Sequence, residues 1–195
     1  MSKMLFFDLE TTGTNPAKNG IHQISGKIII NGNVEDEFNI HIKPNPLAKI
    51  EDEALAVAGI TAEDLQSDKY VPFNTGYNMF VGHLQPWIDK YDKKDKMFLA
   101  GYNVAAFDAQ FLRGLFLQNN DPYFGSWFWS ATVDVMILAM ALLMEDRPKM
   151  ENFKQGTVAK HLGIDVEDDK LHDAMYDIDI CYKIYFEVMK RLKGE

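Results

Sequence analysis

MLFFDLETTG, residues 4–13, is the stretch that decides the fold. Its short aromatic run, followed by Thr and Gly, is the pattern of a buried strand that ends in a loop. Because side chains alternate in direction along a strand, Asp8 and Glu10 project from the same face near its end. Unpaired carboxylates on a central strand cost several kcal/mol unless a cation compensates them. The stretch therefore predicts a central strand with a cation site, and the alternative is the polar face of an edge strand.

The elements expected around this strand begin as an antiparallel meander of strands, and further along the chain strands alternate with helices. Residues 21–30 and 34–42 suit paired strands, and Asn31-Gly32-Asn33 between them is typical of a hairpin turn. We expect further strands at 97–102 and 127–133, and helices at 51–57, 61–65, 74–91 with Pro86 as a candidate kink, 105–118, 134–144, 156–162 and 173–193. This order predicts an α/β fold with a mixed central sheet, an antiparallel meander plus parallel strands, flanked by helices.

Composition limits the class of protein. With 29 acidic and 20 basic side chains, the net charge of −9 excludes a polybasic nucleic-acid or membrane binder. The chain is 47% hydrophobic and lacks a Pro-, Gly- or Ser-rich linker, so one compact domain over 1–195 is expected. The single cysteine, Cys181, permits neither an internal disulfide nor a cysteine zinc cage. We see no signal-peptide pattern, and the apolar run 135–144 is too short for a bilayer, so we expect a cytoplasmic protein without membrane contact.

Two later segments carry further candidate site residues. Asp108 lies in the first turn of the helix expected after the strand at 97–102, and taken alone it is explained by the helix dipole, worth only about 0.3–1 kcal/mol. Asp173 is expected to be the N-cap of the last helix. Asp177 then lies one turn inside that helix, while His172 lies on the preceding loop and is free to move over the site. For His172, an ordinary surface histidine is the alternative.

Together these segments supply four carboxylates and one histidine. An all-oxygen donor set suits the hard cations Mg²⁺ and Mn²⁺, whereas zinc prefers cysteine or more histidines. The residues alone therefore predict a site for one of these two divalent cations.

The order and spacing of the segments resemble the three motifs of the DEDD exonuclease superfamily. The histidine resembles that of the DEDDh (DnaQ-like) branch, which belongs to the ribonuclease H-like superfamily. That branch includes the proofreading subunit of bacterial replicative DNA polymerase and oligoribonuclease. The tyrosine-bearing branch would need Tyr at position 173, which is Asp. The resemblance extends from Met4 to Val188. The matching motifs are Phe7-Asp8-Leu9-Glu10-Thr11-Thr12-Gly13, then Asn103 with Phe107-Asp108, and then His172 with four residues between it and Asp177.

The resemblance implies a ribonuclease H-like fold and the removal of nucleoside 5′-monophosphates from a 3′ end. It implies that two Mg²⁺ or Mn²⁺ ions, roughly 3.5–4 Å apart, stabilise the attacking and leaving oxygens of an in-line displacement. His172 is the implied general base. Thr11 and Phe107 are the implied substrate contacts, at the terminal 3′ hydroxyl and the last base. The implied metal ligands are Asp8, Glu10, Asp108 and Asp177.

The expected substrate is the 3′ end of single-stranded DNA, as for a proofreading enzyme. A DNA polymerase is a candidate partner, and a homo-oligomer is possible. A 3′–5′ exoribonuclease or short-oligonucleotide degrader is the nearest alternative. The metals bind phosphate and other contacts recognise a 2′-hydroxyl, so the motifs do not decide between DNA and RNA. A noncatalytic nucleic-acid- or polymerase-binding module is disfavoured because the carboxylates and the histidine are all present, and an unrelated scaffold leaves them unexplained. Ala58 stands where some members carry a substrate-contacting histidine.

Trp127-Phe128-Trp129 has two interpretations. Alternating aromatic residues in a strand are typical of core packing, and stacking on bases is the alternative. Lys18, Lys43 and Lys170 are interpreted either as contacts to a nucleic-acid strand or as solvated lysines. Cys181 is expected in the core.

Overall fold

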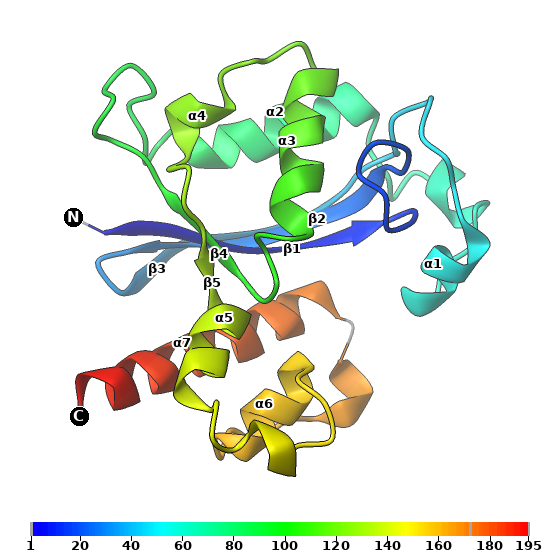
Figure 1. Cartoon of the computed structure of the whole chain (residues 1–195). Coiled ribbons are helices and arrows are strands. Elements are labelled where there is room, and N and C mark those ends of the chain that lie inside the picture. Colours follow the sequence, from blue (N-terminus) through cyan, green and yellow to red (C-terminus); the bar gives the residue numbers. More distant parts are fainter. Residues whose placement is uncertain (1, 172, 195) are drawn as a thin grey trace.

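The computed structural model describes residues 2–171 and 173–194 and is built around one five-stranded sheet (Figure 1). Its strands are β1 (Lys3–Thr11), β2 (Ile21–Ile30), β3 (Asn33–His41), β4 (Phe98–Gly101) and β5 (Val133–Asp134). They lie in the order β3-β2-β1-β4-β5. β2 pairs antiparallel with β1 and β3, whereas β4 pairs parallel with β1 and β5. The predicted mixed sheet is confirmed, and β1 is its middle strand.

Helices cover both faces of this sheet (Figure 1). The helices of the described residues are α1 (Asp52–Val57), α2 (Phe73–Leu84), α3 (Asp108–Gln118), α4 (Phe124–Trp127), α5 (Val135–Leu142), α6 (Gln155–His161) and α7 (Ala174–Lys193), with 3₁₀ turns η1 (Asp64–Gln66), η2 (Arg147–Lys149) and η3 (Asp168–Lys170). α2, α3 and α4 contribute to the hydrophobic core on one face, whereas α5, α6 and α7 contribute to the core on the other. Among the described residues, no helix is long and apolar enough to cross a membrane.

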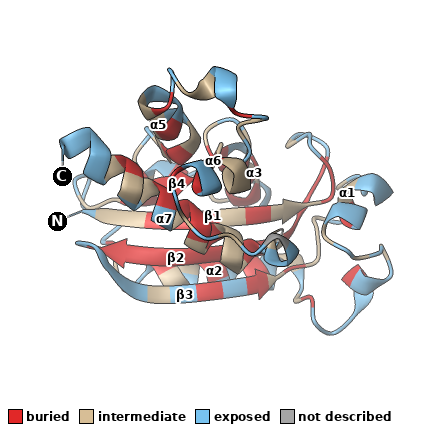
Figure 2. Cartoon of the chain, turned by 90° about the horizontal axis from the view of Figure 1, so that it is seen from below, coloured by how far each residue is buried: buried red, intermediate tan, exposed pale blue. Residues whose placement is uncertain are grey.

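β1 is buried on both faces. Leu5 and Phe7 point into the core beneath α2 and α3, whereas Phe6 points into the core beneath α5, α6 and α7. The neighbouring strand β2 is buried along nearly its whole length (Figure 2). Because side chains alternate along a strand, Asp8 and Glu10 project from the Phe6 face, toward α7. A central strand therefore presents two carboxylates to one helix.

The helix expected at 74–91 is shorter than predicted. α2 ends at Leu84, before Pro86, so the expected kink inside a longer helix is wrong. Proline lacks the N–H that would continue the helix and disfavours helical geometry in the residue before it. The helix expected at 61–65 is likewise reduced to the 3₁₀ turn η1, where the Asp64 carboxylate accepts the N–H of Thr61 at 2.8 Å.

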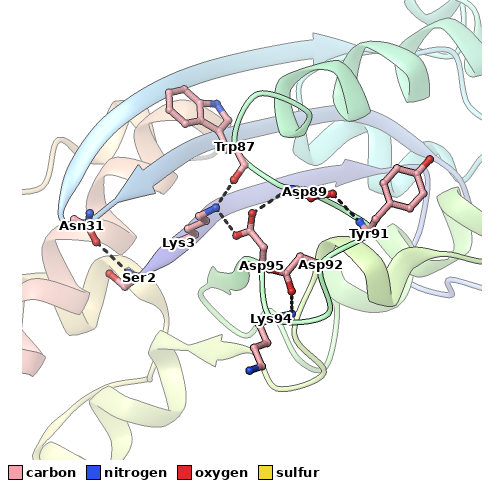
Figure 3. Close-up of polar contacts among 9 residues, drawn as sticks. All are labelled: Ser2, Lys3, Asn31, Trp87, Asp89, Tyr91, Asp92, Lys94 and Asp95. Atoms are coloured by element: carbon pink, nitrogen blue, oxygen red, sulfur yellow. Dashed lines mark hydrogen bonds and ion pairs between the residues drawn. The ribbon is translucent and has the colours of Figure 1, made fainter.

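The loop that replaces the end of this helix is tied to the start of β1 (Figure 3). The Lys3 ammonium donates to the Trp87 carbonyl at 2.6 Å and forms an ion pair with Asp95. Asp89 and Asp92 each accept the backbone N–H two residues further on, at 3.0 and 2.8 Å. These side chains form local turns that compete with a helix, so the chain reaches β4 through an ordered loop.

The strand expected at 127–133 is wrong over most of its length. The stretch begins at the last residue of the short helix α4, and its pairing as a strand is confined to β5, apart from one bridge at Phe128. Packing explains this path, because Phe124 and Phe128 both place their rings against Phe116 of α3. The core interpretation is confirmed for Trp127 and Phe128, which are each 2% exposed.

Candidate active site

Asp8 and Glu10 lie within β1 rather than just beyond it. They pair with Ser25 and Gln23 of β2, so the backbone around both is held by the sheet. Both are partly buried, and α7 packs against the strand that carries them. The prediction that two carboxylates share one face of a central strand is confirmed.

Asp108 is brought to this strand by α3, of which it is the first residue. The residue is 5% exposed, and its Oδ1 accepts the backbone N–H of Leu9 at 3.2 Å. Leu9 lies between the two acidic residues of β1, so Asp108 is bound directly to the strand that carries them. A carboxylate that only complemented the helix dipole would need no such bond, and the site interpretation is therefore favoured over that alternative.

The loop that delivers Asp108 is organised by Asp134, which the sequence marked only as the start of a helix. Asp134 caps α5 by accepting the N–H of Met136, and it also accepts the N–H groups of Asn103 and Ala105, each at 3.1 Å. Asn103 has a left-handed φ of 62°, which turns the chain sharply after β4. One buried carboxylate thus fixes the turn between β4 and α3.

Asp177 completes the group from the first turn of α7. Asp173 is the N-cap of this helix, as predicted, and accepts the N–H of Tyr176 at 2.9 Å. Asp177 and Asp8 line the same small cavity, together with Tyr102 and Gln155. The predicted general base, His172, lies outside the described residues.

The pKa values show that the four carboxylates form one electrostatic group. Burial raises the pKa of Asp8 well above its usual range, and the charges of Asp108, Glu10 and Asp177 raise it further. Burial, Asp177 and Asp173 raise the pKa of Glu10 to about 7. Burial also raises the pKa of Asp108 to about 7, with Glu10 and Asp134 adding to it, although bonds from its own N–H and that of Leu9 oppose the shift. Each of the four acids is therefore close enough to another for one charge to shift the pKa of its neighbour.

A divalent cation fits this donor set. Bringing like charges together in a partly buried site is unfavourable, and a bound cation reverses that local penalty. Within residues 2–171 and 173–194, no three His, Cys, Asp or Glu side chains converge tightly enough to hold an ion unaided. Mg²⁺ commonly binds through one or two carboxylates and completes its shell with water and substrate phosphate. The oxygen donors of Asp8, Glu10, Asp108 and Asp177 match that mode of binding.

Thr11 and Phe107, the expected substrate contacts, are each next in sequence to one of the carboxylates. Thr11 ends β1 next to Glu10, and its hydroxyl donates to the Gly13 carbonyl at 2.8 Å. Phe107 immediately precedes Asp108 and is partly buried. Sequence reasoning missed Thr12, which is fully buried and holds the following loop through a bond from its hydroxyl to the Lys49 carbonyl at 2.7 Å. The loop after β1 is therefore fixed beside the carboxylates.

The lysines proposed as strand contacts differ in their surroundings. Lys170 forms an ion pair with Glu167 at 2.8 Å, and Lys43 donates to the carbonyl of Gln66 at 3.4 Å. Lys18 is exposed, and its backbone N–H and carbonyl hold the loop after β1. These contacts explain the three lysines as ordinary surface and loop residues, and a contact to nucleic acid stays a prediction.

The family model that describes an exonuclease, RNase_T, matches residues 5–185. The chain therefore belongs to this exonuclease family, which is DnaQ-like and has a ribonuclease H-like fold, as the three motifs predicted. The protein is similar to the PolC-type DNA polymerase III of Mycoplasmopsis pulmonis, with 28% identity over 187 residues, 96% of this chain and 11% of the relative. The corresponding polymerase of Clostridium perfringens is 28% identical over 189 residues, 97% of this chain and 11% of its own. The chain thus spans about a tenth of the length of these relatives.

Solved structures of Escherichia coli exonuclease I share the fold. The zinc-bound form of its complex with single-stranded DNA superimposes with a TM-score of 0.76 and 21% identity, covering 100% of this chain and 42% of the exonuclease. The complex with a dT13 oligonucleotide gives a TM-score of 0.72 and 21% identity, covering 98% and 41%. At this level of identity the likeness establishes the architecture, and the chemistry has to be argued from the residues of this chain.

Proposed function

We propose that this chain is a single exonuclease domain that removes nucleotides from the 3′ end of single-stranded DNA with the help of divalent metal ions. The observation that carries the proposal is that β1, α3 and α7 place four carboxylates around one site. Asp108 accepts the N–H of Leu9 between the two acids of β1, and Asp177 lines one cavity with Asp8. A purely structural cluster of this kind would destabilise the fold without a compensating gain. A nuclease uses it to gather cations and, through them, phosphate.

Different residues of the chain would bind the metal ions, accept the proton and contact the substrate. Asp8, Glu10, Asp108 and Asp177 would hold two Mg²⁺ or Mn²⁺ ions, which when bound would stabilise the attacking and leaving oxygens of an in-line displacement at phosphorus. His172 would accept the proton of the attacking water as general base. The backbone amide of Thr11 would lie near the terminal 3′ hydroxyl, and Phe107 would help shape the pocket for the last base.

The assignment to DNA rests on the relatives. The curated relatives are PolC-type DNA polymerases, and exonuclease I has been solved with oligodeoxynucleotides. These relationships favour a proofreading-like activity beside a DNA polymerase. The alternative activity, on RNA or short oligonucleotides, would use the same carboxylates, since a 2′-hydroxyl is read by other contacts. A noncatalytic module is disfavoured because the whole carboxylate set is retained.

Digestion of matched strands tests the substrate assignment. Single-stranded DNA and RNA of the same sequence, each labelled at the 5′ end, would be incubated separately with the protein and Mg²⁺ or Mn²⁺. We expect the DNA strand to shorten faster than the RNA strand. The Glu10→Gln variant, prepared in the same way, controls for contaminating nucleases. Faster shortening of RNA would favour the exoribonuclease alternative, and intact strands in both reactions would favour the noncatalytic module.

A further inference from the structure

Gln155 contacts the carboxylate site from a helix that contributes none of the predicted metal ligands. It is the first residue of α6, and its side-chain Nε2 donates to the backbone carbonyl of Asp177 at 2.7 Å. Its side chain is partly buried and lines the small cavity that also contains Asp8 and Asp177. No sequence pattern distinguishes this residue, because a glutamine at the start of a helix is ordinary.

The Gln155 bond acts on the part of α7 where geometry matters most for the site. A backbone carbonyl has two acceptor lone pairs, so the Asp177 carbonyl can accept the bond from Gln155 in addition to its helical partner. Asp173 caps the start of α7 by accepting a bond from Tyr176. That bond is internal to the turn and does not fix its place against β1. The bond from Gln155 comes from a different element and constrains the position of Asp177 relative to the sheet.

The other end of this connection is anchored to the sheet. Tyr102 directly follows β4, the parallel neighbour of β1, and its hydroxyl donates to the Phe153 carbonyl at 2.6 Å. Phe153 lies two residues before Gln155, and the next turn of α6 is buried at Val158. α6 and α7 lie side by side beneath the sheet (Figure 1). A continuous set of bonds therefore runs from the sheet through Gln155 to the residue that faces Asp8.

We propose that Gln155 is a positioning residue that holds Asp177 opposite Asp8, so that the carboxylates on β1 and α7 can bind a divalent cation together. The proposal rests on the function proposed above. It assigns no contact with substrate to Gln155, which acts through the backbone of a ligand-bearing turn. Partners that orient metal ligands typically change metal affinity or activity by about 10–100-fold when they are removed.

The test compares two variants of the whole chain. Gln155→Met keeps the length of the side chain but removes its donor. Thr157→Val is the matched control, because it removes another α6 side-chain bond of 2.7 Å, from the Thr157 hydroxyl to Asn152 Oδ1. The first readout is the Mn²⁺ concentration that gives half of the maximal thermal stabilisation, measured without nucleic acid. The second is kcat and KM on a 5′-labelled DNA strand at saturating Mn²⁺.

We expect Gln155→Met to need about 10–100-fold more Mn²⁺ and to lower kcat more than it raises KM, while Thr157→Val stays near the wild type in both readouts. Gln155→Asn keeps the amide but shortens its reach, so it should behave like Gln155→Met and provides a second test if that variant does not fold. A wild-type Mn²⁺ dependence in the Gln155 variants, or an equal change in Thr157→Val, would overturn the positioning role. A wild-type protein that neither binds Mn²⁺ nor shortens DNA would instead overturn the proposed function itself, and the positioning role with it.

Discussion

Glu10→Gln is expected to be more stable than the wild type in metal-free buffer and nearly inactive when metal is supplied. The glutamine keeps the shape of the side chain but removes a charge that burial, Asp177 and Asp173 make unfavourable. It also removes an anionic ligand, and a catalytic metal contributes several kcal/mol of transition-state stabilisation, so we expect turnover to fall by about 10³-fold or more. A gain in stability that accompanies a loss of activity is characteristic of a residue kept for function.

The stability difference depends on pH in a defined direction. The folded protein raises the pKa of Glu10 from 4.5 to about 7, so the folded state binds a proton more readily than the unfolded state between these values. Wild-type stability from this group is therefore greatest below pH 4.5 and declines as the pH rises toward 7. Glutamine resembles the protonated acid. The advantage of Glu10→Gln should thus be absent at low pH and reach about 1–3 kcal/mol above pH 7.

Chemical denaturation from pH 4 to 8 in the presence of a chelator, paired with a turnover assay in Mn²⁺, measures both effects. Glu63→Gln is the matched control, since Glu63 is exposed and its side chain caps no helix. It should change neither stability nor turnover. If Glu10→Gln were less stable than the wild type at pH 8, or retained most of its turnover, the role assigned to Glu10 would be wrong.

His172→Ala is expected to separate general base from metal ligand. A general base contributes about 10²–10⁴-fold to the rate, so turnover should fall by that factor. Metal binding should be largely intact, because the histidine is assigned no place in the ligand set. Asp177→Asn, by contrast, should lose both turnover and metal binding.

A thermal melt with and without Mn²⁺ distinguishes these outcomes. A ligand that binds only the folded state adds about 2.7 kcal/mol of stability at a hundred times its dissociation constant. The wild type and His172→Ala should both show this stabilisation, and Asp177→Asn should show little of it. Loss of the Mn²⁺ effect in His172→Ala would make His172 a ligand, and full activity would make it a bystander.

The sequence predicted the parts of this molecule that local pattern controls. A short run with apolar residues on both faces favours an inner strand over an edge strand, so residues 4–13 predicted the place of Asp8 and Glu10 at the centre of the sheet. The Asn-Gly hairpin and the N-cap at Asp173 were likewise predicted from neighbouring residues. In each case the interactions that decide the structure join residues close together in the chain or repeat along one element.

The parts that sequence reasoning missed depend on contacts between distant segments. Asp134 holds the turn before α3 across 31 residues, and Gln155 reaches Asp177 across 22. No local pattern distinguishes these side chains from ordinary helix starts. The wrong strand at 127–133 has the same origin, because packing of Phe124 and Phe128 on Phe116 of α3 overrode the local preference of an aromatic segment for a strand.

The fate of a 5′-labelled single strand of DNA tests the central claim most directly, because it reports polarity and metal dependence in one time course. With Mn²⁺ or Mg²⁺, we predict a ladder of labelled products that shortens one nucleotide at a time from the 3′ end, with release of nucleoside 5′-monophosphates. With EDTA, we predict an unchanged strand. Undiminished cleavage in EDTA, or an internal cut as the first product, would contradict a metal-dependent 3′–5′ exonuclease built on these four carboxylates.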